Sequence, residues 1–194
     1  MSERRLILAS TSPFRRMLLE RLALPFEVRA PDVDETPLAG ESPTDLVRRL
    51  ARAKALAVAG VRPGSLVIGS DQVAVHGGRV VGKPGDHDAA VEQLRAASGQ
   101  RITLYTGLAL VDADSGRGQL EVVPFHVHFR RLDDGMIERY LRREQPYNCA
   151  GSIRSEGLGI ALLARFEGDD PNALVGLPLI RLVAMLEAEG VRVI

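Results

Sequence analysis

Hydrophobic positions in the chain fall into two recurring patterns, which predict strands and helices. Short apolar runs between turn residues are typical of buried strands, whereas apolar residues three, four and seven positions apart indicate one face of a helix. On this basis we expect strands over 6–9, 27–30, 66–70, 73–75, 79–81, 102–111 and 121–129, and another ending near 166. We expect helices over 12–22, 42–59, 86–97, 133–143 and 178–189.

Turn and capping residues support these boundaries. Ser12-Pro13 and Ser42-Pro43 each place a favoured capping serine before a proline, which is tolerated at the first helical position. His76-Gly77-Gly78 separates two short apolar runs and indicates a hairpin. Strands alternate with helices at first, and the middle strands look antiparallel. We therefore expect an α/β fold, a mixed sheet with flanking helices.

Length and composition limit the possible classes. The 194 residues fit a single domain over 1–194, or two small lobes that share a core. Hydrophobic residues make up 45% of the chain, which favours a folded protein over a disordered one. The 25 basic and 25 acidic side chains cancel, so general nucleic-acid binding is not expected.

The cysteine content and the length of the apolar stretches indicate the cellular compartment. The single Cys149 excludes an intramolecular disulfide framework and fits a reducing compartment. No apolar stretch approaches the roughly 20 residues that cross a bilayer. We expect a soluble cytoplasmic protein that does not enter a membrane.

The strong preference of this chain for arginine over lysine draws attention to its few lysines. The chain contains 23 Arg and only 2 Lys, Lys54 and Lys83. Because a compact ammonium differs chemically from a planar guanidinium, a lysine kept against this bias suggests a site that needs the ammonium. The alternative is that two lysines survived by chance.

The turn from the first strand into the first helix could bind an anion. Helix N-termini attract anions through free backbone N–H groups and the helix dipole. Ser10, Ser12 and Arg15 would complete a phosphate-binding cradle there. A capped helix that begins with a surface arginine explains the same residues.

Four charged residues are further candidates. Lys54 lies on the apolar stripe of its helix, so it should point toward the protein body, although a lysine at the stripe edge could also reach solvent. Asp71 follows an apolar strand, where α/β sheets place ligands, and could act as general base or metal ligand. Lys83 precedes a rigid proline, and Glu35 ends an acidic loop. Ordinary turn or loop positions remain the alternatives for these three.

Other possible sites have weaker support. His126 and His128 share one strand face and could bind a metal together, but no third ligand lies nearby in sequence. Cys149 has no obvious neighbouring base and is better explained as a structural thiol. The chain contains neither a Walker A loop nor a G-x-G-x-x-G sequence.

Seven ordered blocks together resemble one family. They are Leu8 to Arg16, Pro31 to Glu35, Arg52 to Ala55, Gly69 to Gln72, Gly82 to Pro84, Ala150 to Ser152 and Val175 to Pro178. In this order they resemble the Maf family of nucleotide pyrophosphatases over essentially the whole chain, and both lysines fall inside blocks. Phe14, Gln72 and Glu156 are most similar to the 7-methyl-GTP pyrophosphatase subgroup. The sister subgroup, which acts on dTTP and UTP, has Arg, Thr and Gln at these positions.

The resemblance implies a fold, a reaction and roles for residues. The fold would have two lobes around a central cleft, like inosine triphosphatases. The reaction would split a nucleoside triphosphate, 7-methyl-GTP, into the monophosphate and pyrophosphate with a divalent cation, Mg²⁺ or Mn²⁺. Asp71 would activate water, and Glu35 with Asp71 would hold the cation. The phosphates would be bound by Ser10, Arg15, Lys54 and Lys83. The base would be selected by Phe14, Gln72 and Glu156.

Residue chemistry agrees with this subgroup. Methylation at N7 makes guanine cationic, which favours stacking on an aromatic face such as that of Phe14. The carboxylate of Glu156 could accept hydrogen bonds from the guanine edge. Alternatives are a dTTP and UTP pyrophosphatase, a nucleotide-binding regulator of cell division with incidental hydrolysis, or a phosphoryl transferase. The missing Walker A loop disfavours the last. Whether the chain forms a homodimer is left open.

Overall fold

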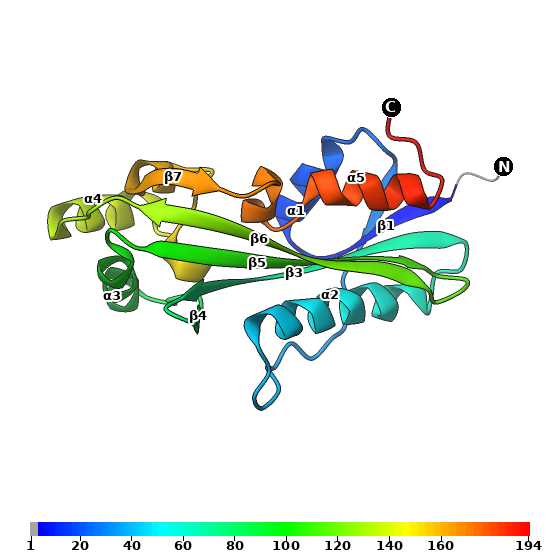
Figure 1. The fold of residues 1–194 in the computed structure, drawn as a ribbon, viewed down its shortest axis with the longest axis horizontal. Coiled ribbons are helices and arrows are strands. Elements are labelled where there is room, and N and C mark those ends of the chain that lie inside the picture. Colours follow the sequence, from blue (N-terminus) through cyan, green and yellow to red (C-terminus); the bar gives the residue numbers. More distant parts are fainter. Residues whose placement is uncertain (1–3) are drawn as a thin grey trace. The chain divides into compact units, whose positions relative to one another are not determined.

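The computed structural model describes residues 4–194, which form a seven-stranded sheet and flanking helices (Figure 1). The strands are β1 (Arg5–Ala9), β2 (Phe26–Arg29), β3 (Ser65–His76), β4 (Arg79–Val81), β5 (Arg101–Asp112), β6 (Gly118–Phe129) and β7 (Leu163–Glu167). The α-helices are α1 (Pro13–Glu20), α2 (Pro43–Ala59), α3 (His87–Ala97), α4 (Asp134–Glu144) and α5 (Leu179–Ala188). Three 3₁₀-helices complete the set, η1 (Ala150–Ser152), η2 (Leu158–Leu162) and η3 (Pro171–Val175). None of the helices between residues 4 and 194 combines the length and apolar character needed to cross a bilayer.

Strand directions confirm the expected mixed α/β sheet. The strand order is β2-β1-β3-β5-β6-β7, with β4 paired to β3 outside this path. β1 runs parallel to both β2 and β3, whereas β3–β4 and β6–β7 are antiparallel. The β3–β4 turn is the expected hairpin, since His76 pairs with Arg79 and Gly77 and Gly78 both have positive φ.

The chain divides into two compact units. Unit 1 comprises the residues up to Gln72 together with Tyr105–Val123 and Asp170–Ile194. Unit 2 comprises Val73–Leu104 and Pro124–Asp169. β3, β5 and β6 contribute residues to both units. The single domain over 1–194 and the central cleft stay predictions.

Unit 1 has apolar residues on both faces of its strands. Leu6 and Leu8 join a cluster with α1 and α5, while Ile7 and Ala9 join a cluster with α2. Side chains that alternate along β1 therefore supply two separate layers. Figure 1 shows α1 and α5 on one side of these strands and α2 on the other. The prediction of a buried strand over 6–9 is confirmed, since Leu6 to Ala9 are all buried.

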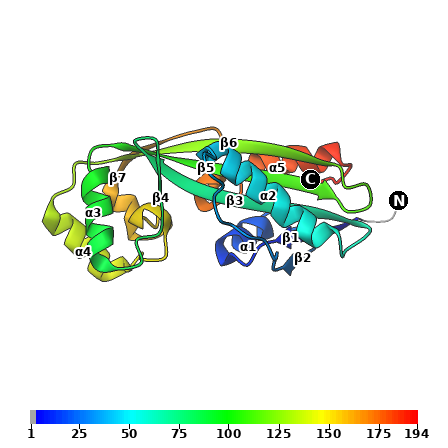
Figure 2. The ribbon, with the colours of Figure 1, turned by 90° about the horizontal axis from the view of Figure 1, so that it is seen from below.

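Unit 2 is built around a pair of helices and the strand segments beside them. Figure 2 shows α3 and α4 side by side, and the two helices contact each other. α3 also contacts η1, and α4 contacts η2. Asp86 and Asp133 cap the two helices by accepting hydrogen bonds from the N–H groups of Ala89 and Met136.

Helix starts agree well with the sequence, and one strand differs. Ser12 and Ser42 cap α1 and α2 by accepting from Arg15 and Asp45 N–H groups. We expected separate strands over 66–70 and 73–75, but these residues belong to one strand, β3, which continues through Asp71 and Gln72 to His76. The correction has a topological reason, because the parallel partner β1 ends opposite Gly69 while β4 pairs with the later residues. Asp71 therefore lies two residues beyond the end of the β1 pairing, inside the longer strand.

Two glycines allow α2 to lie unusually close to the sheet. A Cβ atom added at Gly69 would lie 2.1 Å from the Ala51 carbonyl oxygen, and one at Gly107 would lie 2.1 Å from that of Val47. Real Cβ atoms do not approach backbone atoms so closely, so a side chain at either position would push the helix away. The close contact sets the distance between α2 and β3, on which the residues of the site depend.

Replacing Gly69 with Ala should therefore destabilise the protein and move α2. We expect a loss of about 1–3 kcal/mol in the free energy of unfolding, as for other overpacked positions. Gly60→Ala is the matched control, because its Cβ would meet nothing closer than the Leu56 oxygen at 3.6 Å. Denaturant unfolding measures both, and equal stability of the two variants would contradict the close contact.

Candidate functional site

A buried lysine joins two carboxylates in unit 1. Lys54 Nζ lies 2.7 Å from Asp71 Oδ1 and 2.7 Å from Glu35 Oε1. Lys54 is only 5% exposed and Asp71 7%, whereas the side chain of Glu35 is 61% exposed. Lys54 therefore points into the protein body, as its position on the apolar stripe predicted. Of the two carboxylates that pair with Lys54, Asp71 is therefore buried and Glu35 is open to solvent.

Register explains why Asp71 meets α2. Val67 on β3 belongs to the apolar cluster beneath α2, and residues two apart on a strand share a face. Gly69 and Asp71 therefore face the same helix. Because Gly69 has no side chain, Ala51 and Ala55 approach β3 closely, and the neighbouring Lys54 reaches the carboxylate.

The turn from β1 into α1 supplies the expected hydroxyls and arginine. Ser10 is buried, and its Oγ accepts a hydrogen bond from the Ser12 N–H at 3.1 Å. Arg15 is half-buried and donates from Nε to the Gly176 carbonyl oxygen at 2.9 Å. Burial lowers the pKa of Arg15, while the charges of Asp71 and Glu35 act to raise it. The structure thus brings Arg15 within electrostatic reach of both carboxylates.

The Gly176 carbonyl holds Arg15 in place. It also accepts a hydrogen bond from the buried Ser70 Oγ at 2.8 Å, and the same hydroxyl contacts the Gly107 oxygen at 2.9 Å. Gly176 has a φ of 104°, a conformation that favours glycine. Residue 176 is therefore a fixed acceptor that orients the guanidinium.

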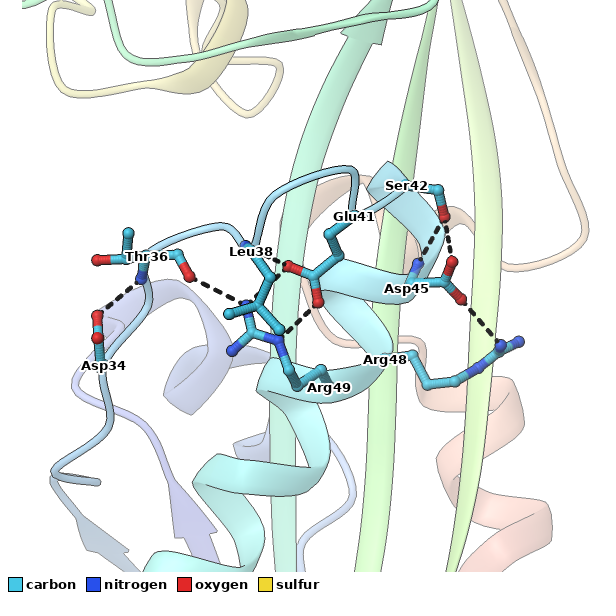
Figure 3. A network of polar contacts seen from close by, with 8 residues as sticks. All are labelled: Asp34, Thr36, Leu38, Glu41, Ser42, Asp45, Arg48 and Arg49. Carbon is cyan, nitrogen blue, oxygen red and sulfur yellow. Dashed lines mark hydrogen bonds and ion pairs between the residues drawn. The ribbon is translucent and has the colours of Figure 1, made fainter.

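An arginine on α2 ties down the loop that carries Glu35 (Figure 3). Arg49 contacts both oxygens of Glu41, at 2.6 and 2.8 Å, and donates to the Thr36 carbonyl oxygen at 3.1 Å. The Thr36 N–H in turn donates to Asp34 at 2.9 Å. Both backbone polar groups of Thr36, the residue after Glu35, are thus bound. Sequence reasoning missed this clamp, because Arg49 is one arginine among 23.

Gln72 lies on the opposite face of β3 from Asp71. Its Nε2 donates to Thr106 Oγ1 at 2.9 Å and to the Ala173 carbonyl oxygen at 2.5 Å. Its amide hydrogens are thus directed at β5 and η3, and any contact with a base would use the amide oxygen. Phe14 lies in the first turn of α1 and is half-buried. Their roles in base selection stay predictions.

Unit 2 carries the other two predicted residues on loops. Lys83 and Glu156 are both exposed, and Ser155 Oγ donates to a Glu156 oxygen at 2.9 Å. Burial raises the pKa of the Cys149 thiol; Glu156 contributes in the same direction, whereas Lys83 opposes it. Both charges therefore act on one thiol, which stays protonated and is a poor nucleophile at neutral pH.

The carboxylates fit one type of metal binding. Between residues 4 and 194 no group of three or more His, Cys, Asp or Glu side chains is placed to hold an ion. Asp71 and Glu35 converge on the same ammonium, each with an oxygen 2.7 Å from it. Mg²⁺ is often held by one or two carboxylates plus substrate phosphates, and keeps several waters. This pair fits a cation whose remaining ligands are waters and the phosphate groups of a substrate.

The two histidines have other partners. His126 Nδ1 lies 2.9 Å from Thr103 Oγ1, and His128 Nε2 lies 3.0 Å from Glu167 Oε2. The ring nitrogens named here therefore take part in hydrogen bonds within unit 2.

Comparison with known proteins settles the family. The family model described as Maf-like protein matches residues 5–189. The chain belongs to the Maf family. Its curated Maf relatives include proteins named 7-methyl-GTP pyrophosphatase from Nitrosococcus oceani, 60% identical over 95% of this chain and 93% of the relative, and from Alcanivorax borkumensis, 59% identical over 96% and 95%. A third, from Pseudomonas syringae, is 57% identical over 97% and 98%.

The solved structures that match this Maf chain include a HAM1 protein from Coxiella burnetii. The alignment has a TM-score of 0.43 at 15% identity and covers 67% of this chain and 75% of that chain.

Replacing Arg49 with Lys should loosen the loop of Glu35. An ammonium cannot contact both Glu41 oxygens and the Thr36 carbonyl in the same forked way. A glutamate-specific protease should therefore cleave after Glu35 several-fold faster. Arg48→Lys is the matched control, since Arg48 makes an exposed contact with Asp45 at 3.5 Å. Equal cleavage rates in the two variants would show that the clamp does not hold the loop.

The clamp should also weaken as the pH falls below 4.5. Hydrogen bonds from Arg49 lower the pKa of Glu41 from 4.5 to about 2, against the effect of burial. A lowered carboxyl pKa stabilises the folded state above the unfolded value and is lost as the pH falls toward the folded one. The stability that Arg49 confers, measured as the difference in the free energy of unfolding between the wild type and Arg49→Lys at each pH, should hold above pH 4.5 and decline between pH 4.5 and about 2.

Proposed function

We propose that this Maf protein hydrolyses 7-methyl-GTP to 7-methyl-GMP and pyrophosphate in the cytoplasm. The names of its curated relatives support this substrate, since these relatives match more than nine-tenths of the chain. The single Cys149 is compatible with a reducing compartment. The observation that carries the proposal is the buried Lys54, which joins Asp71 to Glu35.

Asp71 is the general base of the proposed reaction. Its Oδ1 is paired with Lys54, which leaves Oδ2 to accept a proton from the attacking water. The water oxygen forms a bond to the α-phosphorus as the bond to the α–β bridging oxygen breaks. The electron pair leaves with pyrophosphate. General-base catalysis of this kind contributes about 10²–10⁴-fold to the rate.

The cationic side chains bind and orient the phosphates. Lys54 pairs with both carboxylates in unit 1, Arg15 is under the electrostatic influence of the same two groups, and Lys83 is assigned the same role in phosphate binding. Ser10 adds a hydroxyl at the N-terminal end of α1, where backbone N–H groups favour an anion. Such preorganised charges stabilise the negative charge that grows on a leaving phosphate.

Glu35 and Asp71 would hold the divalent cation, Mg²⁺ or Mn²⁺. When bound, such a cation neutralises charge on the leaving pyrophosphate. The open position of Glu35 suits a cation that arrives with the nucleotide. The Arg49 clamp keeps this carboxylate beside Lys54 and so prepares the site.

Base selection is assigned to three residues. Phe14 offers an aromatic face for the cationic 7-methylguanine, a contact of about 0.5–2 kcal/mol. Glu156 accepts hydrogen bonds from the guanine N1 and N2 positions. Gln72 contributes through its amide oxygen, since its amide hydrogens bind Thr106 and Ala173.

A pyrophosphate-release screen tests this function. The purified protein is given 7-methyl-GTP, GTP, dTTP and UTP in turn, with Mg²⁺ or Mn²⁺, and kcat/KM is compared. We expect the highest value for 7-methyl-GTP. A clear preference for dTTP or UTP would assign the chain to the sister activity, and tight binding without turnover would indicate a regulator.

Asp71→Asn should abolish turnover while nucleotide binding persists. The amide keeps the shape of the side chain but cannot accept the proton, so kcat should fall about 10²–10⁴-fold. Asp32→Asn, on the exposed part of the acidic loop, is the control. Near-normal kcat in Asp71→Asn at saturating nucleotide and metal would remove Asp71 from the role of base.

A further inference from the structure

The loop that carries Lys83 is anchored on both sides of the lysine. The Gly82 carbonyl oxygen accepts hydrogen bonds from the Gly151 N–H and from Gln93 Nε2, each at 3.2 Å. On the other side, the Gly85 N–H donates to the Tyr147 carbonyl oxygen at 3.0 Å. Pro84 stiffens the short stretch in between. The backbone position of Lys83 therefore depends on these few contacts.

Gln93 is itself held in one orientation. Ser152 Oγ donates to Gln93 Oε1 at 2.6 Å. Because the Gly82 carbonyl can only accept, the amide nitrogen of Gln93 must face Gly82 and its oxygen must face Ser152. Ser152 is fully buried and has a φ of 56°, which is uncommon outside glycine. A strained, buried serine thus fixes the glutamine that holds the Lys83 loop.

The segment that carries Glu156 is anchored by a different helix. Glu144, the last residue of α4, accepts from the Leu158 N–H at 2.7 Å and from Arg154 Nη1 at 3.2 Å. Gly157 lies directly against this carboxylate, since a Cβ there would be 2.6 Å from Glu144 Oε1. The carboxylate therefore lies beneath the turn at whose centre Glu156 is found.

The hydrogen bonds described for the two anchors involve different side chains. Gln93 on α3 contacts Gly82 and Ser152, whereas Glu144 on α4 contacts Arg154 and Leu158. Between them, the Arg154 N–H donates to Tyr140 Oη at 3.0 Å, which fixes the chain to α4 before it reaches Glu156. A disturbance at Ser152 should therefore not pass along the backbone to residue 156.

We propose that unit 2 positions its phosphate-binding and base-reading side chains separately, with Gln93 as the positioning residue of Lys83 and Glu144 as that of Glu156. The inference rests on the proposed function, which gives Lys83 the phosphates and Glu156 the base. Neither Gln93 nor Glu144 needs to touch the nucleotide. Each acts through the loop that it holds.

Two measurements report separately on binding of the phosphates and on recognition of the base. Inhibition of hydrolysis by added pyrophosphate reports on the phosphate end, and Lys83→Ala sets the size of its loss. The ratio of kcat/KM for 7-methyl-GTP to that for GTP reports on the base end, and Glu156→Ala sets the size of that change. A general loss of stability would move both readouts together.

Gln93→Leu should weaken pyrophosphate inhibition about 2- to 10-fold, as expected for lost hydrogen bonds, and leave the base ratio unchanged. Glu144→Leu should change the base ratio and leave pyrophosphate inhibition unchanged. Glu92→Ala, an exposed neighbour of Gln93 that pairs with Arg95, should move neither readout.

Conservative variants sharpen the assignment. Gln93→Glu can still accept from Ser152 but cannot donate to Gly82, so it should behave as Gln93→Leu. Glu144→Gln keeps an acceptor for the Leu158 N–H and should retain most of the base ratio. Thermal unfolding of each variant establishes that it is folded at the assay temperature. If Gln93→Leu does not fold, Ser152→Ala removes the hydroxyl that orients Gln93 and should weaken pyrophosphate inhibition alone.

The outcomes distinguish this inference from the proposed function. If Lys83→Ala does not affect pyrophosphate inhibition, the role of Lys83 in the proposed function is wrong. If Lys83→Ala weakens inhibition while Gln93→Leu does not, or if either leucine variant moves both readouts, separate positioning is wrong. Selective effects of the two leucine variants would support it.

Discussion

The burial of the Lys54 ammonium constrains which charges and which backbone segments can lie around it in unit 1. Lys54 is almost completely removed from solvent, and a buried charge is tolerated only when opposite charges or hydrogen bonds compensate for lost hydration. Asp71 and Glu35 provide that compensation at 2.7 Å each. Packing of α2 against β3 brings Lys54 to Asp71, the proposed base, and the loop before α2 brings Glu35 to the same ammonium. The ion pair that makes the buried lysine tolerable also joins the residues that we propose for catalysis.

This centre needs close backbone packing and a held loop. Gly69 and Gly107 let α2 approach the sheet, so a lysine side chain can reach the carboxylate on β3. Glu35 comes from a loop without regular structure, and Arg49 on the same helix ties that loop down. Helix α2 thus supplies both the ammonium of Lys54 and the Arg49 clamp that keeps Glu35 in place. The Glu35 side chain remains 61% exposed, which suits the role that we propose for it as a ligand of an incoming cation.

Much of this arrangement follows from local signals in the sequence. Capping serines, turn glycines and hydrophobic periodicity located the helices and most strands, because these signals act over a few residues. The stripe position of Lys54 and the rarity of lysine pointed to a special role before any geometry was known. Contacts between distant segments left no such signal. Arg49, Gln93 and Glu144 look like ordinary polar residues on helices, and their function lies in loops that only the fold brings near. The extension of β3 past Asp71 depended likewise on its pairing with β4.

The most direct test of the account is the catalytic efficiency of Lys54→Arg with 7-methyl-GTP. A guanidinium keeps the positive charge but is broader than an ammonium, and α2 lies too close to β3 to make room for it. We expect a folded protein whose kcat/KM is lower by about 10²-fold or more, the size expected when a preorganised charge is displaced. Activity near that of the wild type would contradict the claim that the buried ammonium organises the site.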